Sequence, residues 1–233
     1  MYIINMFLKR LFDVVLSFVT IVLLIPLWIA VAIAIKMDSE GPVFFCQERL
    51  TRNGKQFKMY KFRTMIVNAE HSGTGLFNYV NDPRVTRVGR FLRDTSIDEL
   101  PQLLNVIKGD LSIVGPRPPV TYELGDYMTL NRKYKKRFSM RGGITGLAQV
   151  KGRNENSWDE KVTYDNQYIS LFEKQGIWID IKIILETIVQ VFSRKNIYEE
   201  KMSDSLSDAE AARLAEEEII RIAHLPDDDF VEI

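Results

Sequence analysis

Residues 11–35 read LFDVVLSFVTIVLLIPLWIAVAIAI, an apolar run in which Asp13 and Pro26 are the residues that do not conform. As an α-helix, these 25 residues would extend about 37 Å at ~1.5 Å per residue, enough to cross a bilayer core of about 30 Å. The run is too long for the apolar region of a signal peptide, and nothing after it is typical of a secreted protein. We therefore expect a membrane helix, which either spans the bilayer or enters and leaves it by the same face.

Charged residues flank this run on both sides. Lys9 and Arg10 precede it, and Lys36 follows it. Because lysine and arginine favour the cytoplasmic side of a membrane, cations at both ends favour a re-entrant helix. Pro26 lies past the midpoint, where it removes a backbone hydrogen bond and bends the helix, and Asp13 is placed to pair with one of the cations. We predict a membrane anchor built from Lys9, Arg10, Asp13 and Pro26, although the charges alone leave the spanning form open.

The 233-residue chain has zero formal net charge, but its charges are unevenly distributed. Twelve acidic and three basic residues give residues 199–233 a net charge of −9, so residues 1–198 carry +9. A basic body favours anionic partners such as phosphates and lipid headgroups. No RNA- or DNA-binding motif accompanies the charge, so we predict no nucleic-acid partner. The single cysteine, Cys46, excludes an internal disulfide and a cysteine-based metal site.

The rest of the chain predicts a mostly helical α+β fold with one small β-hairpin. Short strands at Val43–Gln47 and Gln56–Tyr60 flank Asn53-Gly54, a dipeptide that favours a tight hairpin turn. The helical spacing of Leu100, Leu103, Leu104 and Ile107 predicts a helix with one buried face, and Gly109 is expected to end this helix. Further helices are expected at Tyr122–Arg137, which is more exposed, at Trp158–Phe172, at Trp178–Phe192, and from a capping box at Ser207 and Glu210 to about Ala223.

The helix at Trp178–Phe192 has one apolar side, which is formed by Trp178, Ile181, Ile184, Leu185, Ile188 and Phe192. Such a side suits an amphipathic helix that lies on the membrane surface with its tryptophan at headgroup level. It suits equally a helix that packs against the protein core. The sequence leaves both interpretations open.

Two adjacent carboxylates, Asp98 and Glu99, open the helix that follows Ser96. Neighbouring helical positions point about 100° apart, so the two groups would take different tasks. One could attack or bind a metal while the other moves a proton, and the helix N-terminus attracts phosphate. Two structural alternatives remain: Asp98 is the N-cap, or Ser96 is the N-cap and Glu99 completes a capping box.

Candidate cations accompany this pair. Pro116-Arg117-Pro118 holds a guanidinium on a stiff backbone, which suits phosphate or base recognition. A surface turn with a solvated arginine would have the same sequence pattern. Strand alternation puts Lys61 and Arg63 on one face, which either binds phosphates or is solvated. Residues 141–153 contain glycines at 142, 143, 146 and 152, which permit a ligand to approach the backbone. Carboxylates, cations and a membrane anchor together suit phosphoryl transfer, usually with Mg²⁺.

At these motifs the chain resembles the bacterial sugar transferase family, the small monotopic polyprenyl-phosphate phosphoglycosyl transferases. The resemblance covers roughly residues 7–195. The segments that carry it are KRLFD at 9–13, GPVFF at 41–45, YKFRTM at 60–65, DELPQ at 98–102, GD at 109–110, VGPRP at 114–118, GITGLAQV at 143–150 and GRN at 152–154. The chain departs from the family pattern at Ile25, where a Ser is usual before Pro26, and at Gly142, where a Pro is usual.

The resemblance implies a two-step reaction at the cytoplasmic face of the bacterial inner membrane, the first membrane step of glycan assembly. Asp98 would attack the sugar-bearing phosphate of a uridine-diphosphate sugar, releasing UMP, and polyprenyl (undecaprenyl) phosphate would then take the phosphosugar from Asp98. The resemblance makes Glu99 the proton-handling partner and implies that Mg²⁺ lies near Asp98. It assigns substrate binding to Lys61, Arg63, Arg93, Pro116, Arg117, Pro118 and Arg153.

The resemblance also divides the chain: residues 1–36 form a re-entrant helix kinked at Pro26, residues 37–195 the phosphoglycosyl transferase domain, and residues 196–233 an acidic helical extension. The extension is a candidate for homodimer formation or partner docking. Two rival functions remain. One is a membrane-anchored, non-catalytic phosphate-binding or scaffolding module, and the other is a glycosyltransferase that moves the sugar without its phosphate.

Overall fold

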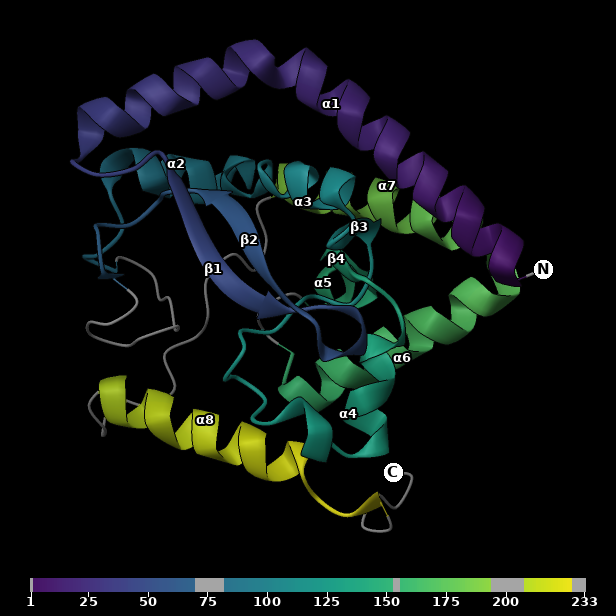
Figure 1. The fold of residues 1–233 in the computed structure, drawn as a ribbon. Coiled ribbons are helices and arrows are strands. Elements are labelled where there is room, and N and C mark those ends of the chain that lie inside the picture. Colours follow the sequence, from purple (N-terminus) through teal and green to yellow (C-terminus); the bar gives the residue numbers. More distant parts are fainter. Residues whose placement is uncertain (1, 70–81, 153–155, 194–207, 228–233) are drawn as a thin grey trace.

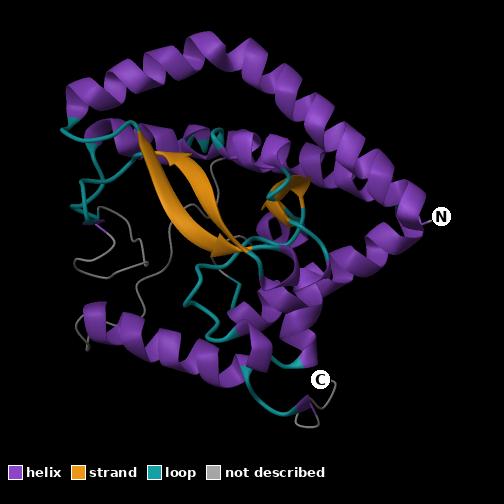
Figure 2. Ribbon diagram, in the orientation of Figure 1, coloured by secondary structure: helices purple, strands orange, loops and turns teal. Residues whose placement is uncertain are grey.

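A computed structural model of the chain describes residues 2–69, 82–152, 156–193 and 208–227. Helices dominate these residues, and two small two-stranded sheets lie among them (Figure 2). The predicted mostly helical fold with a small hairpin is confirmed. The sequence-predicted Arg153, the loop at 71–81 and the cap at Ser207 lie outside the described residues.

The predicted hairpin is present. Strands β1 (Phe44–Leu50) and β2 (Gln56–Phe62) pair antiparallel, and each reaches farther at its carboxyl end than the sequence predicted. Asn53 and Gly54 turn the chain with φ angles of 60° and 70°, a left-handed conformation that Asn and Gly adopt at low cost.

Helix α3 (Gln102–Lys108) forms where it was predicted, and Gly109 ends it with φ = 92°. Its predicted buried face is wrong in part, because Ile107 is exposed while Asn105 and Val106 are fully buried. The reason is polar: Asn105 Oδ1 accepts from Tyr60 N at 3.0 Å, and Asn105 Nδ2 donates to Lys58 O at 2.7 Å. Asn105 thus ties α3 to β2 and turns Val106 into the core.

A second sheet, which was not predicted, pairs β3 (Leu111–Val114) with β4 (Gly142–Thr145) in parallel. Its glycines serve close backbone packing, because a Cβ at Gly143 would lie 2.1 Å from Gly115 N and one at Gly146 would lie 2.2 Å from Gly115 O. Gly142 N donates to Thr51 Oγ1 at 3.1 Å, a bond that the proline usual in the family could not make.

The remaining helices are α2 (Arg87–Asp94), α4 (Arg132–Lys136), α5 (Leu147–Lys151), α6 (Trp158–Gln175), α7 (Ile177–Ser193) and α8 (Asp208–Ala223). Short 3-10 turns lie at Ile97–Glu99, Tyr127–Thr129 and Arg137–Ser139. Of the predicted helices, those at α6, α7 and α8 are confirmed. Helix α6 begins with a capping box in which Ser157 and Glu160 bond each other's backbone N–H.

The single exposed helix predicted at Tyr122–Arg137 is wrong. The side chains of Asp126 and Asn131 each cap a new turn, so the segment divides into a 3-10 turn and α4. The segment is also not solvated throughout, because Tyr134 and Arg137 are at most 2% exposed. Apolar residues of α8 (Ile219, Ile222 and Ala223) pack against the same region, which explains its burial.

Helix α7 turns only part of its predicted apolar side away from the core, because Ile184 packs against the main hydrophobic cluster. Trp178, Leu185 and Ile188 are exposed, while Ile179 and Ile183 on the opposite side pack in the main hydrophobic cluster with α6. The core-facing interpretation therefore holds for Ile184, whereas Trp178, Leu185 and Ile188 do not face the core.

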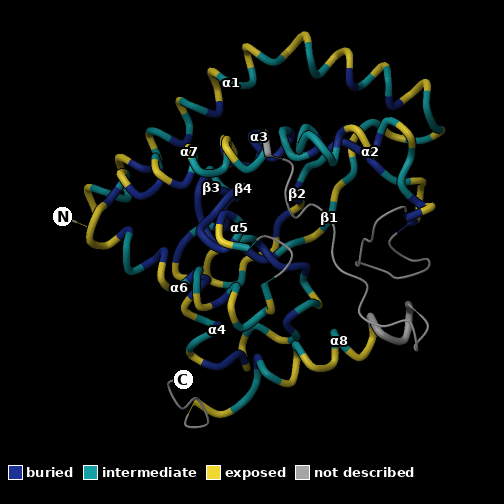
Figure 3. The backbone as a smooth tube through the Cα atoms, turned by 180° about the vertical axis from the view of Figure 1, so that it is seen from behind, coloured by how far each residue is buried: buried dark blue, intermediate teal, exposed yellow. Residues whose placement is uncertain are grey.

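Helix α1 (Tyr2–Asp38) is long and apolar enough to cross a membrane, yet both of its ends rest on the same body. Figure 1 shows it arching over a layer formed by α2, α3 and α7. Near its carboxyl end, Val31 and Ile35 pack against Phe62 and Leu92. The middle of the helix is largely exposed, with Leu23 at 72% (Figure 3).

The amino-terminal half of α1 is held by polar side chains. Lys9 Nζ donates to Asp180 Oδ2 at 2.6 Å and to Val114 O at 2.9 Å. Asp13 accepts from Ser112 Oγ at 2.7 Å and from Ile113 N. The predicted pairing of Asp13 with a neighbouring cation is therefore wrong, because Lys9 is taken by Asp180 and Val114 O while Asp13 accepts its hydrogen bonds from β3.

Candidate active site

Asp98 and Glu99 lie on the 3-10 turn Ile97–Glu99, between α2 and α3. Asp98 is not the N-cap of α3, because α3 begins only after Pro101. Ser96 and Glu99 do not form a capping box, because the Ser96 side chain makes no capping bond. Ser96 itself is left-handed, with φ = 56°. A non-glycine residue in this conformation costs about 1–3 kcal/mol and is typical of functional sites.

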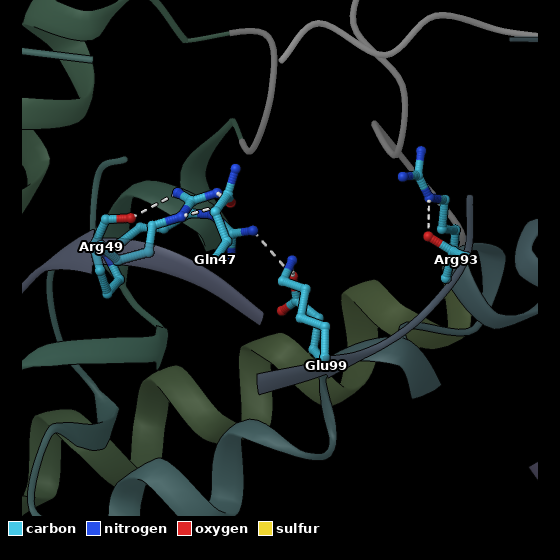
Figure 4. A network of polar contacts seen from close by, with 8 residues as sticks. Gln47, Arg49, Arg93 and Glu99 are labelled. Carbon is cyan, nitrogen blue, oxygen red and sulfur yellow. Dashed lines mark hydrogen bonds and ion pairs between the residues drawn. The ribbon is translucent and has the colours of Figure 1, made fainter. Parts of the chain in front are cut away.

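Glu99 is held by two cations. Its Oε1 atom accepts from Lys61 Nζ at 3.0 Å and from Arg117 Nη2 at 3.0 Å. Burial alone would raise the pKa of Glu99, but Arg117 and Lys61 outweigh it and lower that pKa below its ordinary range. Glu99 is therefore ionised. In the view of Figure 4 it lies between Arg93 on one side and Gln47 with Arg49 on the other.

Asp98 is in the opposite situation. It is 8% exposed, and no hydrogen bond joins its carboxylate to another described residue. Burial raises the pKa of Asp98, the charge of Lys61 partly offsets this, and the charge of Glu99 adds to it. A buried carboxylate that accepts no hydrogen bond is more basic than an ordinary carboxylate, so it can attack an electrophile or bind a cation.

The predicted cations Arg93, Lys61 and Arg63 bond three different parts of the structure. Arg93 Nε donates to Thr64 Oγ1 at 2.9 Å. The backbone of α2 lies so close to Thr64 that a Cβ at Gly89 would be 2.0 Å from Thr64 O, and only glycine fits at this position. Arg63 instead donates to the carbonyls of Ser39, at 2.9 Å, and Glu40, just after α1. Lys61 therefore bonds Glu99, whereas Arg63 bonds the backbone just after the carboxyl end of α1.

The segment Pro116-Arg117-Pro118 is fixed through its three carbonyl oxygens. Pro116 O accepts from Gly143 N at 2.9 Å, Arg117 O from Arg137 Nη2 at 2.7 Å, and Pro118 O from Arg49 Nη1 at 2.8 Å. Arg49 and Arg137 were not predicted as site residues from the sequence. Strand alternation could have found Arg49, which shares a face of β1 with Gln47 and bonds it at 2.6 Å.

One cavity of about 660 Å³ gathers these groups. Of the predicted site residues, its wall includes Lys61, Arg63, Arg93, Asp98, Glu99, Arg117 and Pro118. Pro116 lies outside the wall, at the junction of β3 and β4, and Arg153 lies outside the described residues. A cavity with an unpaired carboxylate and several cations at one end suits chemistry on phosphate esters.

Comparison with known proteins agrees with this chemistry. The sequence profile of the bacterial sugar transferases matches residues 4–194. The chain belongs to the bacterial sugar transferase family. The family resemblance predicted from the sequence is thereby confirmed, and the match ends before α8 begins.

Two curated relatives illustrate what this sugar transferase is similar to. It is 42% identical over 195 residues to a UDP-glucose:undecaprenyl-phosphate glucose-1-phosphate transferase of Xanthomonas campestris pv. campestris, covering 82% of this chain and 40% of that protein. It is 40% identical over 206 residues to an undecaprenyl-phosphate galactose phosphotransferase of Salmonella typhimurium, covering 82% of this chain and 42% of that protein. The sugar transferase thus spans about 40% of the length of these relatives.

The residues of the sugar transferase fit a magnesium ion that is held by one carboxylate together with the phosphates of a substrate. Among the described residues no three acidic, histidine or cysteine side chains gather as a metal cage. Mg²⁺, however, is commonly held by one or two carboxylates together with substrate phosphates and water. Asp98 offers such a carboxylate, since it is unpaired, whereas Glu99 is engaged by Lys61 and Arg117.

Proposed function

We propose that this sugar transferase moves a sugar 1-phosphate from a UDP-sugar to polyprenyl phosphate, giving polyprenyl-diphosphate sugar and UMP. The names of the relatives support the general reaction. The observation that carries the finer proposal is the contrast between Asp98, buried and unpaired, and Glu99, held ionised by Lys61 and Arg117.

In the first step, a carboxylate oxygen of Asp98 attacks the phosphorus that bears the sugar. The new P–O bond forms as the bond to the bridging oxygen breaks, and UMP leaves with that electron pair. In the second step, a phosphate oxygen of polyprenyl phosphate attacks the same phosphorus, and the Asp98–phosphorus bond breaks. The Asp98 carboxylate is regenerated, so the kinetics are ping-pong.

The cations stabilise the charge that moves in these steps. Arg117 and Lys61 can exchange Glu99 for the diphosphate of the donor, because all three side chains line the cavity. Glu99, once released, regains basicity and can handle a proton, as the family resemblance implies. Mg²⁺ held by Asp98 and the diphosphate would supply further charge neutralisation.

We also propose that α1 is re-entrant and that the site faces the cytoplasmic surface of the bacterial inner membrane. Its 37 residues would measure about 55 Å if straight, at ~1.5 Å per residue, yet both ends rest on one body. Exposed apolar side chains on α2 and α7, including Phe91, Trp178 and Leu185, would lie at the headgroups beside it.

The test is the nucleotide released when detergent-purified protein, Mg²⁺ and polyprenyl phosphate meet a panel of UDP-sugars. UMP from one donor, absent for Asp98→Asn, is the expected result. UDP would mean that the sugar moves without its phosphate. Absence of either nucleotide across the panel, together with nucleotide binding, would favour the scaffolding module instead.

A further inference from the structure

The cavity has a second polar end that the proposed chemistry does not use. Arg137 Nη2 and Asp165 Oδ2 form an ion pair at 2.8 Å, and each side chain is 2% exposed. Both residues line the same cavity as Asp98. Trp158 lies beside them, with the Arg137 guanidinium carbon 5.0 Å from its ring centroid.

This end presents polar atoms that the described residues leave unsatisfied. Arg137 Nε and Nη1 have no hydrogen-bond partner among them, and neither do the amide nitrogen and oxygen of Gln149, which also lines the cavity. Buried polar groups in folded proteins are nearly always paired. Four such atoms on one cavity wall therefore indicate a ligand that both donates and accepts hydrogen bonds.

The chemistry of these groups narrows the ligand. A hydroxyl group donates one hydrogen bond and accepts others, so it can donate to Asp165 or to the Gln149 oxygen and accept from Arg137 or the Gln149 nitrogen. Two adjacent hydroxyls on one ring match the paired guanidinium and carboxylate of Arg137 and Asp165, and the Gln149 amide on the same cavity wall offers a further donor and acceptor. The indole of Trp158 adds an apolar surface for the carbon face of such a ring.

The position of this end relates it to the reaction. Arg137 Nη2 also donates to Arg117 O, and the Arg117 guanidinium reaches Glu99, beside Asp98. A donor whose diphosphate lies at Arg117 can reach Arg137 with one of its rings, because both residues line the same cavity. The two candidate rings are the transferred sugar and the ribose, and both carry adjacent hydroxyls.

We propose that Arg137, Asp165 and Gln149 form a subsite for a hydroxyl-bearing ring of the nucleotide-sugar donor. This inference rests on the proposed function, which supplies the donor. The rival is a purely internal role, in which the ion pair only fixes the backbone of Arg117.

Binding separates the two roles. Isothermal titration of the full-length protein in detergent with Mg²⁺ would measure dissociation constants for UDP-glucose, UDP-galactose and UMP. The variants are Asp165→Asn and Gln149→Ala. The matched control is Asp159→Asn, the same change on the same helix, where the carboxylate pairs with Lys133 and does not line the cavity.

We expect Asp165→Asn and Gln149→Ala each to weaken UDP-sugar binding about tenfold, and Asp159→Asn to change it less than twofold. Unchanged UMP binding would assign the subsite to the transferred sugar, and equally weakened UMP binding would assign it to the ribose. Unchanged affinity in both variants, for every probe that the wild type binds, would overturn the proposal. If Asp165→Asn does not fold, Gln149→Ala decides alone, since Gln149 lies outside the ion pair.

The result is independent of turnover. If the wild type binds donors through this subsite but releases no UMP, the proposed reaction fails and the subsite stands. If the wild type releases UMP while both variants bind normally, the subsite fails and the reaction stands.

Discussion

Two lysine–carboxylate pairs in this molecule have the same chemistry and different settings. Lys9–Asp180 lies under α1 with side chains 5% and 1% exposed, and Tyr168 and Val114 O complete its hydrogen bonds. Lys61–Glu99 lies on the cavity wall with side chains 17% and 22% exposed, and Arg117 shares the carboxylate. The buried pair has only internal partners, whereas a ligand can reach the open one. Access for an exchanging anion therefore distinguishes a pair that can bind a ligand from a pair that only holds α1 to the body.

The largest expected effect comes from the residue beside the open pair. Asp98→Asn should reduce turnover on the order of 10⁴-fold, because the nucleophile is lost. Burial raises the pKa of Asp98, so the ionised form destabilises the folded protein at neutral pH. The unfolding temperature of the variant should therefore stay equal or rise. A large drop in that temperature would show that Asp98 is a structural residue.

Breaking the buried pair Lys9–Asp180 should, in contrast, lower the stability of the folded protein. Lys9→Met leaves Asp180 buried without its cation, which costs roughly 3–5 kcal/mol of folding free energy. Thermal unfolding in detergent would measure the loss. Lys182→Met, on the same helix as Asp180 but in an exposed pair, is the control and should change little. An unchanged unfolding temperature in Lys9→Met would mean that α1 does not depend on this contact.

Breaking the open pair should affect the donor more than the fold. Arg117→Ala should raise the KM for the UDP-sugar by roughly 10–100-fold, because a cation for the diphosphate is lost. The unfolding temperature should fall only slightly, since partly exposed pairs contribute about 1 kcal/mol or less. Steady-state kinetics with varied donor would show the change. An increase in the KM for polyprenyl phosphate alone would place Arg117 on the acceptor instead.

The smallest expected change is in the pH dependence, measured on the activity that remains when Glu99, the proposed proton-handling partner, is replaced. The reaction needs ionised Asp98, so its rate falls as pH drops through the raised pKa of that residue. Glu99→Gln removes a negative neighbour and leaves Lys61 and Arg117 nearby, so the pKa of Asp98 should fall. The acid limb of the kcat/KM profile should therefore move to lower pH. A move to higher pH would contradict this electrostatic assignment.

Local signals in the sequence predicted much of the fold. The hairpin follows from the backbone preferences of Asn53 and Gly54, and the end of α3 follows from Gly109. The face of α3 could not be predicted from apolar spacing, because Asn105 is buried by bonds to β2. The pairing of β3 with β4 could not be predicted either, because the two strands are short, parallel and far apart in the sequence.

The candidate site divides in the same way. Asp98, Glu99, Lys61 and Arg117 could be predicted as members of a site, but their convergence on one Glu99 oxygen could not. Arg137 and Arg49 were missed because the sequence does not show that they bond carbonyls of Arg117 and Pro118, 20 and 69 positions away. Residue types suggest the chemistry, and the fold decides which groups meet.

In the proposed reaction, Asp98 carries the phosphosugar between donor and acceptor. The most direct test is exchange of labelled UMP into UDP-sugar by the purified protein with Mg²⁺ and without polyprenyl phosphate. We expect exchange with the wild type and none with Asp98→Asn, because the first step is reversible and needs no acceptor. Exchange that appears only after polyprenyl phosphate is added, in a protein that turns over normally, would contradict a covalent Asp98 intermediate.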